Sequence, residues 1–170
     1  MLQLAKQYLK NPLQISITHR EESKPKIKEE IIRTSLANKN QRFLKELENC
    51  KGRILVFVRT QERTHRIGQL LLDKGHRVGI LHGGRNQLQR KQALSQFKKG
   101  THPILVATDI AGRGIDISDI GHVINFDIPS TREDYIHRIG RTGRFGAEGR
   151  AISFLTERDH WEERIVFGRG

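Results

Sequence analysis

The sequence lacks the features of several protein classes. Its one cysteine in 170 residues, Cys50, excludes an internal disulfide and a cysteine-rich zinc site. It has no apolar run long enough to cross a bilayer and no basic-then-apolar leader, and its mean hydropathy is −0.59. No two of its eight histidines lie three or four residues apart, as a helical metal pair would. We therefore expect a soluble protein without membrane or metal, in a reducing cytoplasmic compartment.

Negative charge is scarce relative to positive charge. The chain has 31 Lys and Arg residues against 19 Asp and Glu residues, which gives a formal net charge of +12 and a pI of about 10.3. Such a surface suits a polyanion such as nucleic acid, but it is also typical of an ordinary solvated face. Charge alone leaves both interpretations open. The length suits one domain of ordinary size.

Short apolar runs alternate with segments of helical period. The expected strands are KIKEEIIRTS at an edge, RILVFV, RVGILH, PILVAT, HVINFD and GRAISFL. The expected helices are NKNQRFLKELEN, QERTHRIGQLLLDKG with a left-handed glycine cap, NQLQRKQALSQFKKG and TREDYIHRIGR. Repeated strand and helix units of this kind predict a doubly wound parallel α/β sheet.

The two ends of the chain have their own patterns. Residues 2–12, LQLAKQYLKNP, predict a short amphipathic helix that stops at its proline, and the charged segment 18–30 that follows is typical of an exposed connector. The final residues, HWEERIVFGRG, are expected to form a truncated helix.

Ligands of such sheets bind beyond the carboxyl ends of the strands. After PILVA, Thr108 offers a hydroxyl, and Gly112 and Gly114 allow close approach of a phosphate. Asp109 and Asp116 flank this segment and could accept a hydrogen bond from a ribose hydroxyl. A plain strand-to-helix turn explains the same residues, so this segment alone does not distinguish a nucleotide-binding site from a structural turn.

A second polar segment follows the HVINFD strand. Arg138, Arg141 and Arg144 recur every three residues, and the intervening glycines are expected to loosen or end the helix. Guanidinium groups at a glycine-rich turn suit phosphate oxygens or developing phosphoryl charge. Salt bridges to nearby carboxylates are the alternative, and His137 could be a structural histidine.

Four motifs together resemble one known family. VFVRT at 56–60, HGG with QLQR at 82–90, ATDIAGRGID at 107–116 and HRIGRTGR at 137–144 are similar, in order and spacing, to motifs of the second RecA-like lobe of DEAD-box RNA helicases. The resemblance spans roughly residues 26–155. It implies a RecA-like three-layer α/β/α fold with a mainly parallel central sheet. The family more often has alanine at Gly112, so the glycine is expected to loosen that segment slightly.

The resemblance also implies roles for residues at matching positions. The RNA backbone would be held by Thr60, Gly83, Gln87, Arg90 and Thr108. ATP would be contacted by Gly114, Asp116, Arg141 and Arg144, the two arginines acting as arginine fingers on the γ-phosphate, with His137 completing the catalytic set. Coupling between the lobes would involve Asp109, Arg113 and Arg138.

The motifs that would bind the nucleotide phosphates are absent. The sequence has no G-x-x-x-x-G-K-[ST], D-E-A-D or S-A-T motif. We therefore expect residues 1–17 to be the end of a first lobe, 18–28 an interlobe linker and 29–170 the helicase C-terminal domain. ATP with Mg²⁺ would be bound mainly by that first lobe. The partners expected are RNA, ATP and the first lobe, and the isolated chain would be an inactive monomer.

Two other functions stay open on the sequence. The chain could be a stand-alone RNA-binding or chaperone lobe without catalysis. It could also be a lobe of a DNA-directed helicase.

Overall fold

The structure, a computed structural model, describes residues 26–112, 117, 120–143 and 147–168, and its centre is a six-stranded sheet. The strands are β1 (Ile27–Arg33), β2 (Arg53–Phe57), β3 (Val78–Leu81), β4 (Ile104–Ala107), β5 (Ile120–Asn125) and β6 (Gly149–Leu155). They lie in the order β1-β6-β5-β2-β4-β3, and every pair of neighbours is parallel.

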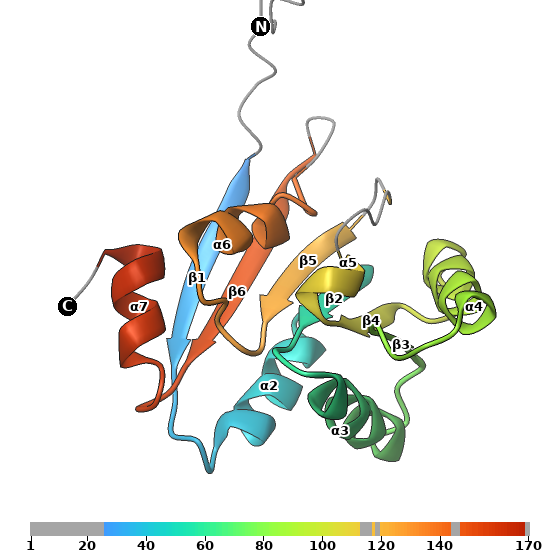
Figure 1. The fold of residues 1–170 in the computed structure, drawn as a ribbon, viewed down its shortest axis with the longest axis horizontal. Coiled ribbons are helices and arrows are strands. Elements are labelled where there is room, and N and C mark those ends of the chain that lie inside the picture. Colours follow the sequence, from blue (N-terminus) through green and yellow to red (C-terminus); the bar gives the residue numbers. More distant parts are fainter. Residues whose placement is uncertain (1–25, 113–116, 118–119, 144–146, 169–170) are drawn as a thin grey trace, which may run out of the picture.

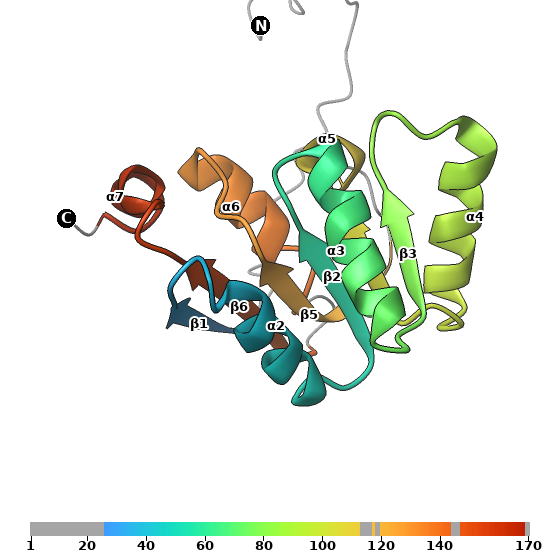
Figure 2. The same ribbon diagram turned by 90° about the horizontal axis from the view of Figure 1, so that it is seen from below.

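Helices cover both faces of the sheet (Figures 1 and 2). They are α2 (Lys39–Glu48), α3 (Gln61–Asp73), α4 (Gln87–Lys98), α5 (Asp109–Gly112), α6 (Arg132–Ile139) and α7 (His160–Phe167). Helices α2 and α3 pack on one face, and α4, α5, α6 and α7 pack on the other. The expected three-layer arrangement with a parallel sheet is therefore confirmed.

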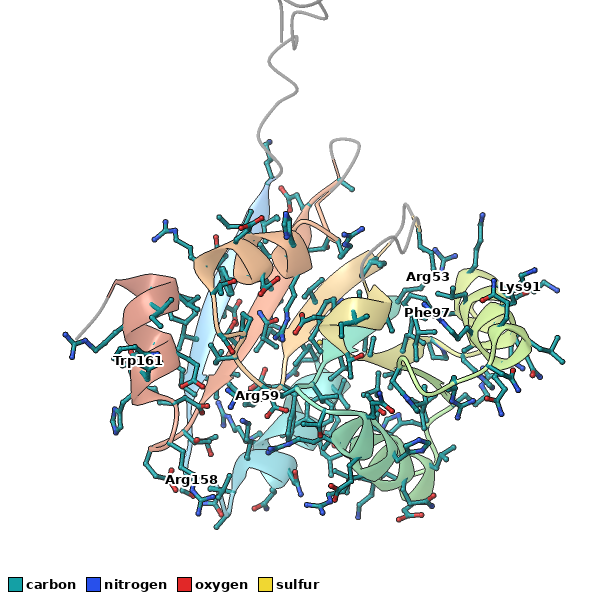
Figure 3. All side chains as sticks on the ribbon, viewed as in Figure 1. Arg53, Arg59, Lys91, Phe97, Arg158 and Trp161 are labelled. Atoms are coloured by element: carbon teal, nitrogen blue, oxygen red, sulfur yellow. The ribbon has the colours of Figure 1, made fainter. Side chains whose placement is uncertain are left out.

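The central strand β2 shows why the apolar runs are continuous. Ile54 and Val56 face α2 and α3, while Leu55 and Phe57 face the opposite layer, and all four are buried. A strand covered on both faces needs apolar side chains at every position. The amphipathic helices follow the same logic, because Phe97 of α4 is fully buried against the sheet while the lysines of that helix lie outside (Figure 3).

Capping residues fix where the helices begin and end. The Thr60 hydroxyl accepts a hydrogen bond from the Arg63 N–H at 3.2 Å at the start of α3, and Asn86 forms a capping box with Gln89 at the start of α4. The predicted left-handed cap of α3 is Gly75, which has φ +80°. These caps place two helix N-termini directly after the loops that leave β2 and β3.

Two further segments can be compared with the sequence predictions. The chain passes from β4 into the helical turn α5, in which the Gly112 N–H donates to the Thr108 carbonyl at 2.8 Å, so the first residues of this segment form a strand-to-helix turn. The helix predicted at the end of the chain is α7 (His160–Phe167), and it is followed by Gly168 in the left-handed region (φ +66°).

The amino-terminal predictions fall mostly outside the described residues. Residues 1–25, with the expected helix and most of the expected linker, are among those that the structure does not describe. Strand β1 starts at Ile27, so the last two residues assigned to the linker, Ile27 and Lys28, already lie in the sheet. Within the described part of the chain, no helix has both the length and the apolar character needed to span a membrane.

A forked ion pair attaches the edge strand β1 to the rest of the sheet. Arg150 of β6 donates to both carboxylate oxygens of Glu30, at 3.0 and 2.6 Å, and lies 3.5 Å from Glu46 of α2. The hydrogen bonds from Arg150 lower the pKa of Glu30 to about 2, against the opposing effect of desolvation. Because the folded state prefers the ionised carboxylate, this pair stabilises the fold above pH 4.5, and its contribution disappears as the pH falls towards 2.

We predict that Glu30→Gln lowers the free energy of unfolding by about 1–2 kcal/mol at pH 7, allowing for partial solvent screening. The difference between variant and wild type should shrink as the pH falls below 4.5. Urea unfolding at several pH values between 7 and 3 measures it, with Glu48→Gln on the exposed side of α2 as the control. A constant difference down to pH 3 would show that the carboxylate charge is not responsible.

Candidate functional site

Four of the predicted site residues surround one small pocket between α5 and α6. They are Asp109, His137, Arg138 and Arg141, and the lining is completed by Phe57, Gly112 and Asp134. The pocket forms because α6 runs back along the face of the sheet beside α5 after β5 ends. The structure therefore brings together residues that lie nearly thirty positions apart in the sequence.

Arg138 is buried beneath this pocket, with 2% of its surface exposed. Its guanidinium donates to both carboxylate oxygens of Asp109, at 2.5 and 2.7 Å, and also to the Asn125 side chain and the Asp127 carbonyl. The same group stacks on the Phe57 ring, 5.0 Å from its centroid. Arg138 therefore joins α6 to α5 and to the end of β5, and four of its five N–H groups are used within this lobe.

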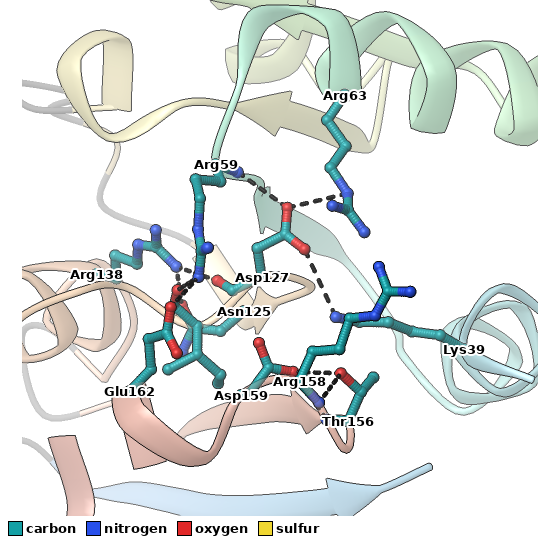
Figure 4. Close-up of polar contacts among 11 residues, drawn as sticks. Lys39, Arg59, Arg63, Asn125, Asp127, Arg138, Thr156, Arg158, Asp159 and Glu162 are labelled. Atoms are coloured by element: carbon teal, nitrogen blue, oxygen red, sulfur yellow. Dashed lines mark hydrogen bonds and ion pairs between the residues drawn. The ribbon is translucent and has the colours of Figure 1, made fainter. Parts of the chain in front are cut away.

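Asp127 continues this polar network towards α3 (Figure 4). Its carboxylate accepts a hydrogen bond from the Arg59 N–H at 3.0 Å and lies 3.2 Å from Arg63 Nε and 3.5 Å from Lys39 Nζ. Lys39 and Arg63 also lie over the Phe126 ring. Burial lowers the pKa of Lys39, although Asp127 acts in the opposite direction. One residue, Asp127, thus contacts Arg138 through its carbonyl and the start of α3 through its carboxylate.

The network also reaches α7. Arg59 donates to Glu162 of α7 at 2.7 Å, and Asp159 accepts hydrogen bonds from the Thr156 N–H and hydroxyl at 2.8 and 2.7 Å (Figure 4). These contacts hold the start of α7 beside the carboxyl end of the sheet.

The turn that follows α6 is anchored to the start of β5, at the opposite end of the sheet from the pocket of Arg138. Helix α6 ends at Ile139, as the glycines of this segment predicted. Thr142 is buried, and its hydroxyl donates to the Ile120 carbonyl at 2.5 Å. This anchor fixes the turn that carries Arg141, whose N–H bonds the Arg138 carbonyl at 3.1 Å. His137 remains half exposed at the pocket rim, 4.0 Å from Glu133.

Most of the predicted RNA-binding residues lie on exposed loops at the carboxyl end of the sheet. Thr60 begins α3, and Gly83 lies in the loop after β3, where a Cβ atom would be 3.6 Å from Gln61. Gln87 is exposed and Arg90 half buried on the first turn of α4. The loops after β2 and β3 therefore form one surface.

Thr108 differs from the other predicted RNA-binding residues because only 7% of its surface is exposed. Its N–H bonds the Leu81 carbonyl of β3 at 3.2 Å, and its carbonyl starts α5. Four further predicted site residues lie outside the described residues: Arg113, Gly114, Asp116 and Arg144. No three His, Cys, Asp or Glu side chains in the described part of the chain are grouped to hold a metal ion.

Sequence reasoning missed the residues that hold Arg138 in place. Asn125 and Asp127 stand in the otherwise apolar run HVINFDI, and a buried polar side chain in such a run needs a hydrogen-bonding partner. That signal could have identified them as members of a buried network. Nothing in the sequence around Lys39 indicates that its ammonium is buried against Asp127.

Comparisons with known proteins identify the family of the chain. The model of the helicase conserved C-terminal domain matches residues 35–146. The chain is 42% identical over 156 residues to the ATP-dependent RNA helicase RhlB of Shewanella pealeana, covering 91% of this chain and 36% of that protein. It is 41% identical over 157 residues to the probable ATP-dependent RNA helicase DDX23 of Homo sapiens, covering 92% and 19%.

Solved structures of DEAD-box proteins have the same fold. The DEAD-box protein of the hyperthermophile Methanococcus jannaschii matches with a TM-score of 0.78 and 34% identity, covering 98% of this chain and 46% of that one. The E. coli DEAD-box protein SrmB, solved bound to the regulator RraA, matches with a TM-score of 0.74 and 38% identity, covering 81% and 82%.

The matching family model and the parallel RecA-like sheet thus define a helicase C-terminal domain. The chain belongs to that family, as the C-terminal RecA-like lobe of the DEAD-box type. It spans between about a fifth and a third of the length of the curated relatives it matches.

Gly112 lets α5 pack closely on the Phe57 ring of β2, a role that the sequence did not indicate. A Cβ atom at this position would lie 2.5 Å from Cε1 of Phe57. The Phe57 ring has little room to move because it is buried and Arg138 stacks on its face. The glycine is therefore required by close packing of α5 on β2.

We predict that Gly112→Ala lowers the free energy of unfolding by about 1–3 kcal/mol, because the added methyl overpacks the site. Urea denaturation measures the change. Gly121→Ala is the control, since a Cβ atom there would meet no atom closer than 3.4 Å. A Gly112→Ala protein as stable as the wild type would contradict the packing argument.

Proposed function

We propose that the chain is the second lobe of an ATP-dependent RNA helicase that couples ATP hydrolysis to local unwinding of an RNA duplex or to remodelling of a ribonucleoprotein. The observation that carries the proposal is the presence of two candidate surfaces on one lobe. One is the arginine-lined pocket between α5 and α6, and the other is the exposed surface formed by the loops after β2 and β3. The buried bonds of Arg138 and Asp127 connect them.

The described residues fit only part of an ATP site. Arg141 and the half-exposed His137 supply donors at the pocket, but the Asp109 carboxylate is already paired with Arg138. The chain also has no G-x-x-x-x-G-K-[ST] loop. We therefore assign the nucleotide and its Mg²⁺ mainly to a first lobe, with Arg141, Arg144, Gly114 and Asp116 approaching ATP from this lobe.

Within this proposal, Arg141 and Arg144 stabilise the charge that develops on the transferred phosphoryl group. Arg138 has a different role, because its N–H groups are used inside the lobe. We assign to Arg138 and Asp109 the positioning of α6, and hence of Arg141, and through it the coupling between lobes. Arg113 would share that coupling role.

The proposed RNA surface contacts the backbone, not the bases. Helices α3 and α4 both begin at this surface, and their free N–H groups and the Arg90 side chain suit phosphate oxygens. Thr60, Gly83 and Gln87 lie on the same surface. Thr108 lies beneath it, so we assign Thr108 to the support of the loop after β3.

The proposed organisation of the parent protein follows from these assignments. Residues 29–170 form the second lobe together with Ile27 and Lys28, which lie in β1, and the rest of 18–28 forms the linker. Residues 1–17 are the end of the first lobe. When the lobes close, RNA lies across both and the arginines reach the nucleotide. The isolated lobe is a monomer in this proposal.

We predict that the purified 170-residue chain has negligible ATPase activity with or without RNA, and binds single-stranded RNA weakly and with strong salt dependence.

Arg90→Ala should weaken binding similarly for different RNA sequences and reduce the slope of log K against log [salt] by about one. Lys99→Ala, at the far end of α4, removes the same charge and is the control. Fluorescence anisotropy with labelled RNA measures the affinity and its salt dependence for each variant.

Three outcomes would overturn this proposal. RNA-stimulated ATP hydrolysis by the purified chain would show that no first lobe is needed. Preference for DNA over RNA in competition would favour a DNA-directed helicase. RNA annealing by a protein encoded without a first lobe would favour the chaperone alternative.

We predict that Arg141→Ala in the full-length parent lowers kcat for RNA-stimulated ATP hydrolysis by about 10³-fold or more, with a much smaller change in KM for ATP. A group that acts on the transition state affects turnover more than ground-state binding. Steady-state kinetics measures the two parameters, with Arg164→Ala on the exposed side of α7 as the control. An unchanged kcat with a raised KM would contradict the assignment.

A further inference from the structure

Two histidines face each other beside the proposed RNA surface. His65 lies on α3 and His82 directly follows β3, and their Nε2 atoms are 2.8 Å apart. Their rings meet edge to face with centroids 4.7 Å apart. His82 is 5% exposed, whereas His65 is exposed. The motifs that place this lobe in its family do not include His65.

The hydrogen bonds of His82 define its tautomer. The Gly84 N–H donates to His82 Nδ1 at 3.2 Å, so Nδ1 must carry a lone pair. A neutral His82 then carries its proton on Nε2 and donates it to His65 Nε2. His65 must therefore accept at Nε2 and carry its own proton on Nδ1. When both rings are neutral, each fixes the tautomer of the other.

The turn that these bonds hold is packed tightly. A Cβ atom on Gly84 would lie 2.5 Å from Gln61 Oε1 and 3.2 Å from His82 Nδ1. The turn is thus wedged between the start of α3 and the His82 ring. Rotation of that ring would remove the acceptor of the Gly84 N–H.

We propose that His65 is a positioning residue for RNA binding, which acts by holding His82 as the Nε2–H tautomer so that the Gly83–Gly84 turn is preformed. This inference rests on the proposed RNA function of the turn. It adds a residue of α3 that does not itself need to touch RNA. The contribution is preorganisation, because a turn that is already ordered loses less entropy on binding.

The surroundings of His82 favour its neutral form. Burial, His65 and Arg85 lower the pKa of His82, in that order. On α3, Glu62 and Arg66 flank His65, but they pair with each other at 2.8 Å. Neutral His82 is therefore favoured, and it is the state in which Nδ1 accepts from the Gly84 N–H and the turn is held.

The test combines a spectroscopic readout with RNA binding by the 170-residue chain at pH 7.5. Two-bond ¹⁵N–¹H correlation spectra report the tautomers, and we expect Nε2–H for His82 and Nδ1–H for His65. His65→Ala removes the acceptor, so the His82 signals should move towards a mixture of tautomers. Affinity for a labelled oligouridylate should fall about three- to tenfold, the effect of one lost hydrogen bond.

His65→Gln separates this role from a general structural one. The glutamine carbonyl oxygen can accept from His82 Nε2–H in the place of the imidazole nitrogen, so both the tautomer and the affinity should return close to wild type. His160→Gln on α7 controls for loss of an exposed histidine.

The outcomes distinguish this inference from the proposed function. If RNA binds and depends on Arg90, but His65→Ala leaves the His82 tautomer or the RNA affinity unchanged, His65 is not a positioning residue. An affinity loss that His65→Gln fails to restore gives the same conclusion. If no RNA binds at all, the proposed function and the inference both fail, whatever tautomers the spectra show.

Discussion

The buried guanidinium of Arg138 is the constraint on which the site depends. A charge with 2% exposure is stable only if it is paired and hydrogen-bonded, and its partners come from three segments. The order of the sheet makes this possible, because β2 lies between β5 and β4. Phe57 at the end of β2 forms the floor, while Asn125 of β5 and Asp109 after β4 supply acceptors from either side. The parallel topology thus brings these partners around one site, which the long, forked side chain of Arg138 fills.

Asp127 transmits the position of that cation to the start of α3. Its carbonyl accepts from Arg138, and its carboxylate accepts from the Arg59 N–H, one residue before the cap of α3. A displacement of α6 must therefore either break a buried hydrogen bond or move Asp127 and the start of α3 with it. This chain of contacts gives a physical route between the pocket of Arg141 and the loops proposed to hold RNA. It consists of named bonds that double-mutant cycles can measure.

The strands, the main helices and most motif positions could be predicted from the sequence, because each depends on a local pattern. Continuous apolar runs specify strands buried on both faces, and caps such as Thr60 and Asn86 mark helix starts. The role of Gly112 could not be predicted, since its reason is the ring of Phe57, fifty-five residues earlier. The contact between His65 and His82 likewise depends on how α3 packs beside β3. Side-chain contacts across elements leave no periodicity in the sequence, so the structure is needed to find them.

The distribution of charge follows from the same packing. Several carboxylates lie in ion pairs at the other side of the molecule, including those of Glu30 and Glu163 with arginines of neighbouring strands. Between Asp73 and Asp109 the chain has no acidic residue and seven cations: Lys74, Arg77, Arg85, Arg90, Lys91, Lys98 and Lys99. This single segment thus carries more than half of the net charge of +12. It contains β3 and α4, and Figure 3 shows Lys91 on the outer side of α4. Arg85, Arg90 and Lys91 lie in the loop after β3 and on the first turns of α4, so these three cations add positive charge beside the proposed RNA surface. The other four cations lie before β3 or at the end of α4, on the far side of this unit.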